Sequence, residues 1–368
     1  MRILFALPGL HRVHRGAEVV FESIAQEIAL EGEHDVTLIG SGLEIPDRAY
    51  RFKQVPSVLR NRFESWPKMP FFRSEFMYED LTFAAGLMTA GWRNETDVTV
   101  TCNYPYTNWA LRAHYPKGKR PAHVFVTQNS DWPAYERRRE YRFFSCDGLV
   151  CTNPFYFERN QDRWHSTLIP NGIDQTRFCP GPANRALLGL PEGRPVILMV
   201  SALEDGKRVL EGMRAVAAMP GVFFVVAGDG PLRKEVDRLA ADLLPGRFLR
   251  TTFPHELMPV LYRSADVFLH MAIREPFGNV YIEALASGTP IVAHNDENTR
   301  WILEDHAYLV DTTSEQALME AMMKSLHAPA ARSARGAAFA ASRYGWRVVA
   351  RRYCDFFSDV LSRVRPAS

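Results

Sequence analysis

Two carboxylates eight residues apart mark the stretch of the chain most suited to chemistry. Glu275 and Glu283 are separated by a short run that includes a proline, a glycine and Asn279. Eight residues of one helix turn through about 800°, so two glutamates on a single helix would not share a face. The proline and glycine instead favour a loop that carries Glu275, a helix N-cap near Asn279 and Glu283 about one turn inside the helix.

A helix that begins near Asn279 would point the backbone N–H groups of residues 278–281 out of its first turn, where an anion can bind. Carboxylates repel phosphate, so the two glutamates suit neutral hydroxyl groups better. Glu283 also lies in an apolar run, and a buried glutamate without a partner is rare. The stretch therefore predicts a sugar–diphosphate–ribose ligand, with phosphates at the helix start and hydroxyls on Glu275 and Glu283.

Four other loops follow apolar, strand-like runs and carry glycine or polar residues. They are Arg15-Gly16-Ala17-Glu18, Gln128-Asn129-Ser130-Asp131, the turn that contains Lys207-Arg208, and Gly228-Asp229-Gly230-Pro231. Gly16 and Gly228 would let the backbone approach a ligand closely, but each also fits a plain structural turn. The polar cluster at 128–131 fits either a binding site or the N-cap of a helix.

The adjacent cations Lys207 and Arg208 stand where a helix is expected to start. Positive charge at a helix start opposes the helix dipole, so it needs a reason. A bound diphosphate would supply one through charge-assisted hydrogen bonds. The alternative is a solvated basic turn whose charge is offset by Glu204 and Asp205.

Apolar runs typical of buried strands recur along the chain and alternate with helical patterns. The first series is Arg2–Leu7, Asp35–Ile39, Asp97–Cys102, Ala122–Thr127 and Gly148–Thr152; the second is Val196–Ser201, Val222–Ala227, Phe248–Thr252, Val267–His270, Pro290–Ala293 and Ala307–Val310. Such alternation is typical of parallel sheets in α/β folds, which bind ligands at the carboxyl ends of their strands. We therefore expect two open α/β domains whose strand ends face a shared cleft.

The turn at Pro170–Asp174 separates the two series. We expect a first domain over residues 1–170 and a second over residues 171–343. A helical pattern at about 344–368 predicts a terminal helix that crosses back onto the first domain.

Composition narrows the class of protein. The chain has 368 residues, 46% of them hydrophobic and 23% charged, and a net charge of +2, which argues against bulk nucleic-acid binding. Its five cysteines form no CxxC pair, which is typical of reduced thiols in a cytoplasmic protein. Neither HxH nor HExxH occurs, so no metal site is expected, and no G-x-S-x-G nucleophile elbow is present. No apolar run reaches the length of a membrane span.

Residues 48–73 carry seven basic side chains and one acid, interleaved with aromatic and aliphatic residues. One interpretation is a solvated loop with its arginines spread over apolar surface. The other is a peripheral contact with anionic lipid, or with a phosphorylated acceptor.

In this order, the loops resemble the motifs of the retaining nucleotide-sugar glycosyltransferases of family four, which have the GT-B fold of two facing Rossmann-like domains. Glu275 and Glu283 resemble the family's E-x7-E motif. Residues 171–174, Asn-Gly-Ile-Asp, resemble its interdomain signature, and residues 228–231 resemble its nucleotide-side turn. The resemblance is strong over residues 168–311 and weak over residues 40–95.

The resemblance implies transfer of a hexose from a nucleotide-diphosphate sugar to a glycan, a lipid-linked saccharide or a small molecule, with retained anomeric configuration. Cations and helix-start N–H groups would stabilise the leaving diphosphate, without metal or cofactor. It implies catalytic roles for Glu275, Lys207 and Asn129. The implied donor-binding residues are Gly16, Lys207, Arg208, Gly228, Phe277, Gly278, Asn279 and Glu283, and the implied acceptor-side residues are Arg15, Gln128 and Asp131.

Three departures affect this expectation. Arg15 replaces the first glycine of the family's first loop, and Ala202 stands where a phosphate-binding arginine is usual, so Arg208 or Arg15 would have to substitute. The family's catalytic-region histidine is replaced by Gln128 or Asn129. Two alternatives therefore stay open: a binding protein for nucleotide sugars that has lost transfer, and a sugar epimerase or phosphorylase on the same fold. A dinucleotide oxidoreductase is disfavoured because no strand is followed by G-x-G-x-x-G.

Overall fold

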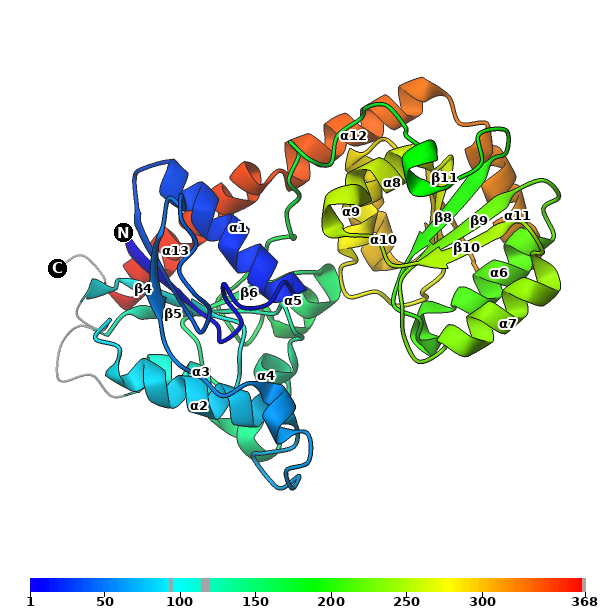
Figure 1. Cartoon of the computed structure of the whole chain (residues 1–368). Helices are drawn as coiled ribbons and strands as arrows, with labels where there is room; N and C mark the ends of the chain where they lie inside the picture. The colour runs from blue at the N-terminus through cyan, green and yellow to red at the C-terminus, as the bar shows by residue number, and fades with distance from the viewer. Residues whose placement is uncertain (93–94, 114–119, 366–368) are drawn as a thin grey trace. The chain divides into compact units, whose positions relative to one another are not determined.

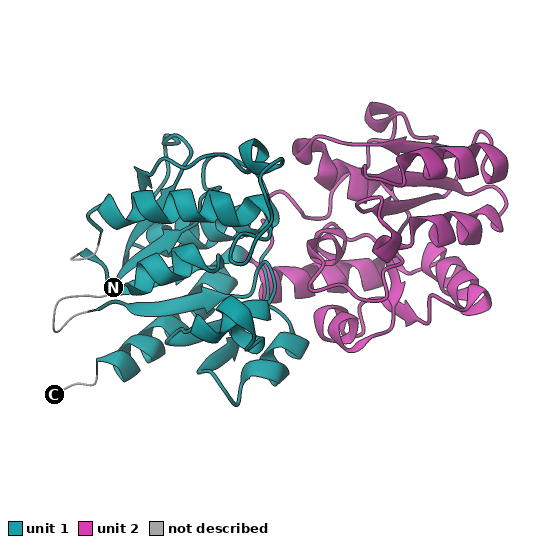
Figure 2. Cartoon of the chain, turned by 90° about the horizontal axis from the view of Figure 1, so that it is seen from below, with its two compact units in different colours: residues 1–172, 346–368 teal, residues 173–345 magenta. Residues whose placement is uncertain are grey.

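The computed structural model describes residues 1–92, 95–113 and 120–365 (Figure 1). The chain forms two compact units, coloured separately in Figure 2. Unit 1 comprises Met1–Gly172 and Trp346–Ser368, and unit 2 comprises Ile173–Gly345. The sequence placed both changes of domain two residues earlier. Residues 366–368 of the expected terminal helix lie outside the described residues.

Unit 1 is built on a seven-stranded sheet in which every pair of neighbouring strands is parallel. The strands are β1 (Arg2–Ala6), β2 (Asp35–Gly40), β3 (Arg51–Gln54), β4 (Val98–Thr101), β5 (Ala122–Val126), β6 (Gly148–Cys151) and β7 (Ser166–Leu168). Their order across the sheet is β3-β2-β1-β4-β5-β6-β7. The register sets Ile3 of β1 opposite Val36 of β2 and Val98 of β4, so apolar residues meet at the centre.

Helices cover both faces of this sheet. Successive residues of β1 point to opposite faces and all are apolar after Arg2, so both faces have to be buried. Its helices are α1 (Gly16–Leu30), α2 (Glu75–Thr89), α3 (Tyr106–Arg112), α4 (Trp132–Tyr135), α5 (Pro154–Asn160) and α13 (Trp346–Val364), with 3-10 turns η1 (Arg60–Phe63) and η3 (Arg139–Phe143). Ile3 and Phe5 join the apolar cluster of α1 and α13, which lie side by side in Figure 1. Leu4 and Ala6 point to the opposite face and pack against α2 and α3.

Unit 2 repeats this plan with six parallel strands in the order β10-β9-β8-β11-β12-β13. They are β8 (Val196–Val200), β9 (Phe223–Ala227), β10 (Phe248–Thr251), β11 (Val267–His270), β12 (Ile291–His294) and β13 (Tyr308–Val310). The helices are α6 (Val209–Ala217), α7 (Arg233–Leu243), α8 (Met258–Ser264), α9 (Asn279–Ala286), α10 (Glu297–Leu303), α11 (Glu315–Leu326) and α12 (Ala330–Tyr344), with 3-10 turns η4 (Ala186–Leu188), η5 (Asp205–Lys207) and η6 (His255–Leu257).

The central strand β8 again divides its side chains between two cores. Ile197 and Met199 pack with α6, α7 and α11, whereas Val196 and Leu198 pack with α8, α9, α10 and α12. Parallel strands that are buried on both faces have continuous apolar sequences. For this reason β8 and its neighbours could be predicted from the sequence. The expected α/β fold of two Rossmann-like sheets is confirmed.

Strand β3 was not predicted, because it lies inside the basic segment 48–73 that the sequence analysis treated as a loop. It pairs with β2 at the edge of the sheet, and Arg51 and Lys53 are exposed. Charged side chains are common on edge strands because they discourage pairing with other chains. Because an edge strand carries polar residues, the sequence of β3 does not differ from that of a loop.

Helix α13 packs so closely on β6 that only glycine fits beneath it. A Cβ atom at Gly148 would lie 2.6 Å from Cγ2 of Val360 and 2.9 Å from the ring of Phe356. Phe357 on the same helix is fully buried, and its ring meets that of Phe5 edge-on at 6.2 Å. Helix α13 is thus part of the core of unit 1.

The Phe357→Ala variant should destabilise unit 1 by about 3–5 kcal/mol, because it removes a fully buried ring and leaves a cavity. Hydrogen exchange of amides in β1 and α1 would measure the loss. The control is Phe155→Ala, whose ring is 57% exposed, and it should change stability by less than about 0.5 kcal/mol. Equal protection in the two variants would contradict the assignment of α13 to the core.

Candidate functional site

The switch point of the unit 2 sheet lies between β8 and β11. From β8 the chain runs outward to β9 and β10, and then returns on the other side with β11. Loops at the carboxyl ends of two such strands diverge and leave a crevice, which is where open α/β sheets bind ligands. Lys207 follows β8, and Glu275 follows β11, so both candidates flank this point.

The structure brings Lys207, Glu275 and His270 into direct contact. Nζ of Lys207 lies 2.5 Å from Oε2 of Glu275, and Nε2 of His270 lies 3.2 Å from the same oxygen. Burial by itself would raise the pKa of Glu275, but the hydrogen bonds from His270 and Lys207 outweigh it and hold that pKa below its ordinary value. Glu275 is therefore an ionised acceptor that fixes an ammonium group at the switch point.

This arrangement revises the predicted turn around Lys207. The helix after it begins only at Val209, and Lys207 ends the 3-10 turn η5 instead. The sequence offered Glu204 and Asp205 as charges that offset a solvated turn, but the carboxylate on Lys207 belongs to Glu275, 68 residues further along the chain.

The loop between β11 and α9 is closed by a glycine with a left-handed backbone. Gly278 has a φ of 75°, and a Cβ atom there would lie 2.7 Å from the ring of Tyr281 and 2.8 Å from Cγ of Glu275. Asn298 on α10 holds the loop from outside, since its Nδ2 donates to the carbonyl of Glu275 at 2.6 Å. The loop that carries Glu275 is thus positioned by backbone as well as by its side chain.

Helix α9 begins one residue differently from the expectation. Its N-cap is Gly278, without a side-chain cap, and Asn279 is the first helical residue rather than the cap. The N–H of Tyr281 donates to the carbonyl of Gly278 at 2.9 Å, so it is not available to an anion as the sequence analysis expected. A tight first turn of 3-10 type explains the difference.

Glu283, on α9, is partly buried and accepts a hydrogen bond from α8. The hydroxyl of Tyr262 on α8 donates to its Oε2 at 2.7 Å. Burial raises the pKa of Glu283 above its ordinary value, and the hydrogen bond from Tyr262 acts against that rise. A carboxylate kept in such surroundings is unfavourable for folding, which is a common property of functional sites.

Other residues of the predicted donor set have structural partners. The guanidinium of Arg208 donates to Oγ1 of Thr312 at 3.0 Å and lies 3.4 Å from the carbonyl of Met271. A Cβ atom at Gly228 would lie 1.9 Å from the carbonyl oxygen of Ser201. Packing of two protein loops therefore accounts for Gly228 without a ligand. Phe277 is buried and meets Tyr344 edge-on at 6.3 Å, so its side chain anchors the loop.

In unit 1 the switch point lies between β1 and β4, and Arg15 and Gly16 follow β1. Both are exposed, and Arg15 is the N-cap of α1 without a side-chain cap. Glu18, one turn into α1, is buried, which raises the pKa of its carboxyl group. A Cβ atom at Gly9 would overlap this carboxylate at 1.9 Å.

The polar loop 128–131 is more tied into unit 1 than the sequence suggested. Nε2 of Gln128 donates to Oδ1 of Asn171 at 2.6 Å. Asp131 is almost fully buried and accepts from Nε of Arg159 at 2.9 Å and from Asn160 at 2.8 Å. Asn129 is exposed, and its Nδ2 donates at long range to Oδ1 of Asn103 at 3.4 Å and to Sγ of Cys102 at 3.6 Å. Of the three, Asn129 is the most accessible.

His123 is not a replacement for the absent catalytic-region histidine. It is fully buried in β5, between Oγ1 of Thr99 at 2.9 Å and Nδ2 of Asn108 at 3.0 Å. Burial lowers its pKa to about 3, so the ring is neutral. Its role is to join β4, β5 and α3.

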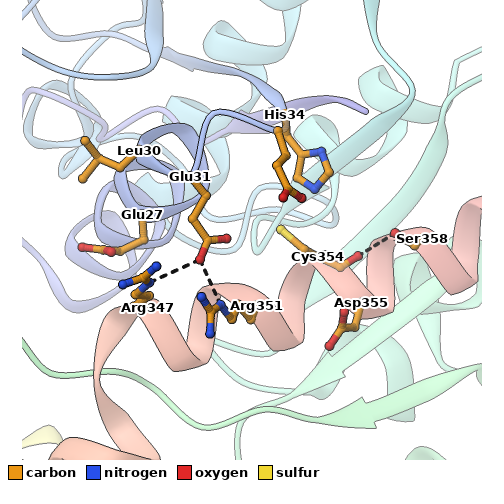
Figure 3. A pocket seen from close by; sticks show the side chains of 10 residues that line it. Glu27, Leu30, Glu31, His34, Arg347, Arg351, Cys354, Asp355 and Ser358 are labelled. Atoms are coloured by element: carbon orange, nitrogen blue, oxygen red, sulfur yellow. Dashed lines mark hydrogen bonds and ion pairs between the residues drawn. The ribbon is translucent and has the colours of Figure 1, made fainter.

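A pocket between α1 and α13 lies near the amino ends of the unit 1 strands. Figure 3 shows that Arg347 and Arg351 point to one carboxylate, Glu31, at 3.4 and 2.9 Å. The lining residues outside α13 lie at the end of α1 and in the turn before β2, away from the carboxyl ends of the strands. These ion pairs fasten α13 to α1. Within the described ranges, no group of three or more His, Cys, Asp or Glu is arranged to hold a metal ion.

Sequence reasoning missed three side chains of the unit 2 site, namely Tyr262, His270 and Asn298. His270 had a recognisable signal, because it is the last residue of a predicted strand and directly precedes the loop of Glu275. Tyr262 and Asn298 come from α8 and α10, and nothing local in the chain points from them to the site.

Comparison with known proteins agrees with this geometry. Residues 182–339 match the family model for glycosyl transferases group 1. The lipopolysaccharide core biosynthesis glycosyltransferase LpsE of Rhizobium meliloti is 31% identical over 54% of this chain and 57% of its own, so the chain spans little more than half of this relative. LpsD of the same organism is 27% identical over 68% of this chain and 73% of its own.

Solved structures share the fold over nearly the whole chain. Sucrose-phosphate synthase from Thermosynechococcus elongatus has a TM-score of 0.76 at 20% identity and covers 98% of this chain and 99% of its own. HepE from Anabaena, in complex with UDP and glucose, has a TM-score of 0.71 at 17% identity, with 98% and 100% covered. Residues 182–339 thus resemble the glycosyl transferases group 1, and the whole chain shares the fold of these solved structures.

Proposed function

We propose that the protein transfers a sugar from a nucleotide-diphosphate donor to a glycan, a lipid-linked saccharide or a small molecule, with retention of configuration and without a metal ion. The observation that carries the proposal is the ammonium group of Lys207, held by Glu275 at the switch point of unit 2 beside the uncapped start of α9. A fixed cation and helix-start N–H groups can stabilise a leaving diphosphate, which is where negative charge develops in this reaction.

The donor is assigned to unit 2. Glu283 lies on α9, one turn beyond the expected phosphate position, where a carboxylate can accept hydrogen bonds from the ribose hydroxyls. HepE, which shares the fold, was solved with UDP and glucose, which supports a nucleotide-diphosphate sugar as ligand. Glu275 contacts the sugar while it positions Lys207.

The acceptor is assigned to unit 1, with Asn129 and Arg15 as its exposed candidates. The names of LpsE and LpsD support a glycan or lipid-linked acceptor, as in lipopolysaccharide core biosynthesis. A lipid-linked acceptor of this kind would lie at the cytoplasmic surface of a membrane. The segment before α2 has exposed apolar and basic side chains that could bind such a surface.

We assign the membrane contact to residues 58–70, between β3 and α2. Val58, Leu59, Trp66 and Met69 are exposed there, together with Arg62 and Lys68. Three other bases of residues 48–73 are engaged internally: Lys53 donates to the carbonyl of Ala90, Arg60 pairs with Glu79, and Arg73 pairs with Glu140.

The aromatic part of this segment is partly ordered by packing. Trp66 meets Phe63 and Tyr78 edge-on, at 4.9 and 5.2 Å. An exposed Trp beside Arg62 and Lys68 is typical of residues that settle at a lipid interface. Among the described residues, no helix has the length and apolar character needed to cross a bilayer.

The Glu283→Gln variant should have opposite effects on binding and on stability. A lost charge-assisted hydrogen bond should weaken nucleotide-sugar affinity about 10- to 150-fold. The folded-state pKa of Glu283 lies above its unfolded value of about 4.3, so its stabilising contribution, present below that value, is lost as pH rises through the folded pKa. Removing the charge should therefore raise the melting temperature at pH 7.5, and the gain should shrink toward pH 4.5.

Calorimetric titration with UDP-, GDP- and ADP-sugars, beside thermal melts at both pH values, would measure both effects. Glu235→Gln is the matched control, since that carboxylate is exposed on α7. Unchanged affinity in Glu283→Gln would remove the ribose assignment, and a lower melting temperature at pH 7.5 would give Glu283 a purely structural role.

The Lys207→Met variant should release nucleoside diphosphate at least about 100-fold more slowly, since it removes a donor aimed at developing charge. Its affinity for the matching nucleoside, which has no phosphate, should stay unchanged. Lys234→Met is the control, because Lys234 is exposed on α7. The assay mixes each labelled nucleotide sugar with a broad acceptor mixture and follows nucleoside diphosphate. If wild-type protein binds a donor but releases none, the chain is a binding protein and the transferase proposal fails.

The Arg62→Gln/Lys68→Gln double variant should bind anionic vesicles about 30-fold more weakly, since each base near the surface contributes roughly 1 kcal/mol. Sedimentation with phosphatidylglycerol vesicles at low salt would measure it, and phosphatidylcholine vesicles should bind neither protein. Arg233→Gln/Lys234→Gln on α7 should behave as wild type. Wild-type protein that stays in the supernatant would end the membrane assignment.

A further inference from the structure

A pocket of about 390 Å³ in unit 1 is not used by any role assigned above. Its lining residues are Arg73, Trp132, Glu136, Arg138, Arg139 and Tyr141. It directly follows the acceptor-side loop, because Trp132 is the next residue after Asp131. Pockets of roughly 300–1,000 Å³ with aromatic walls and a few placed polar groups are typical of small-ligand sites.

One wall of the pocket is fixed and close to neutral. The guanidinium of Arg73 forms an ion pair with Glu140, which is almost fully buried, and lies over the ring of Tyr141 at 5.3 Å. Tyr141 in turn stacks on Tyr104 at 5.8 Å. Since Glu140 balances Arg73, this wall provides shape rather than charge.

The acidic side chain that lines the pocket, Glu136, already has hydrogen-bond donors of its own. The carboxylate of Glu136 accepts from the backbone N–H groups of Arg137 and Arg138, at 2.8 and 3.0 Å. Those hydrogen bonds hold the pKa of Glu136 below its ordinary value, so it is ionised. It caps its own turn, and its charge also acts on Arg138, although no ion pair between Glu136 and an arginine of the pocket is formed within the part of the chain that the structure describes.

The cations that remain are Arg138 and Arg139. Both are exposed, and neither has an ion pair or a side-chain hydrogen bond among the described residues. Arg139 also has a φ of 56°, a left-handed conformation that costs a non-glycine residue free energy. Two unpaired guanidinium groups in one pocket favour an anion with several oxygen acceptors.

Trp132 adds a second chemical preference. Its side chain is 55% exposed although tryptophan is among the residues most often buried on average. A flat, exposed indole in a pocket offers a stacking surface for the apolar face of a ring, and its N–H can donate to a hydroxyl. The pocket thus combines a platform for a ring with two cations.

We propose that this pocket is an acceptor subsite for an acidic sugar, meaning a saccharide unit that carries a carboxylate or a phosphate. The sugar ring lies on Trp132, and its anionic group is held by Arg138 and Arg139. The inference rests on the proposed function, since it names the substrate class of the acceptor side in unit 1.

The test is titration of the full chain with four probes, followed by ligand-observed NMR. Glucuronate and glucose 6-phosphate represent the two kinds of acidic sugar, and glucose and inorganic phosphate are the separate halves. We expect the acidic sugars to bind, and the Arg138→Gln/Arg139→Gln variant to bind them at least tenfold more weakly. Trp132→Ala should weaken the acidic sugars severalfold but leave inorganic phosphate unchanged.

Arg137→Gln/Arg142→Gln is the matched control, since these neighbours carry the same charge but do not line the pocket. Loss of acidic-sugar binding in this control equal to that in Arg138→Gln/Arg139→Gln would overturn the proposal, as would a wild-type protein that binds glucose as well as glucuronate.

Donor binding and release of nucleoside diphosphate, measured on the same samples, separate this inference from the proposed function. If the wild-type protein releases nucleoside diphosphate and the pocket variants do so equally well with every acidic acceptor, only the subsite is wrong. If no nucleoside diphosphate is ever released, the transferase proposal fails, while selective binding of acidic sugars would still support the pocket as their site.

Discussion

The ion pair between Lys207 and Glu275 is the interaction on which the unit 2 site depends. It joins the loop after β8 to the loop after β11 across the point where the sheet changes direction. His270 donates to the same carboxylate, and Asn298 holds the backbone beside it. Removing Glu275 would leave the ammonium group of Lys207 part-buried without its carboxylate, which costs more than the pair itself contributes, whereas removing Lys207 would leave Glu275 with His270 as its donor. The site is thus set in place before a ligand arrives.

Whereas the Lys207–Glu275 pair helps to hold the unit 2 site together, the charge of Glu283 makes folding less favourable. Its carboxylate accepts from the hydroxyl of Tyr262, and its chain neighbours Ile282 and Ala284 are fully buried. An apolar residue would suit this position better for folding alone, since burial acts against the charged form. Proteins retain such groups where a ligand needs them.

Unit 1 uses its polar residues differently. Asp80, His123 and Asp131 are each buried and bonded to neighbouring elements. Asp80 accepts from the N–H groups of Tyr106 and Thr107 and so caps α3. The groups free to meet another molecule lie instead on the rim, in the loop around Asn129 and in the pocket of Arg138 and Arg139. Recognition in this unit therefore falls to exposed loops on a rigid scaffold.

The sequence by itself determined the two parallel sheets, because strands buried on both faces are written as continuous apolar runs. It also located Glu275, Glu283 and Lys207, since charges next to such runs need a reason. It could not locate β3, whose edge position makes it polar, nor the first turn of α9, where one residue decides between a cap and a helix.

Only the tertiary structure decided which groups meet. Lys207 and Glu275 are 68 residues apart, and Tyr262 reaches Glu283 from another helix. Tertiary packing also showed that Gly228 is required by the carbonyl of Ser201, and that Arg208 is tied to Thr312. Such pairings come from the order of strands in the sheet, and local patterns in a chain carry no information about contacts over that separation.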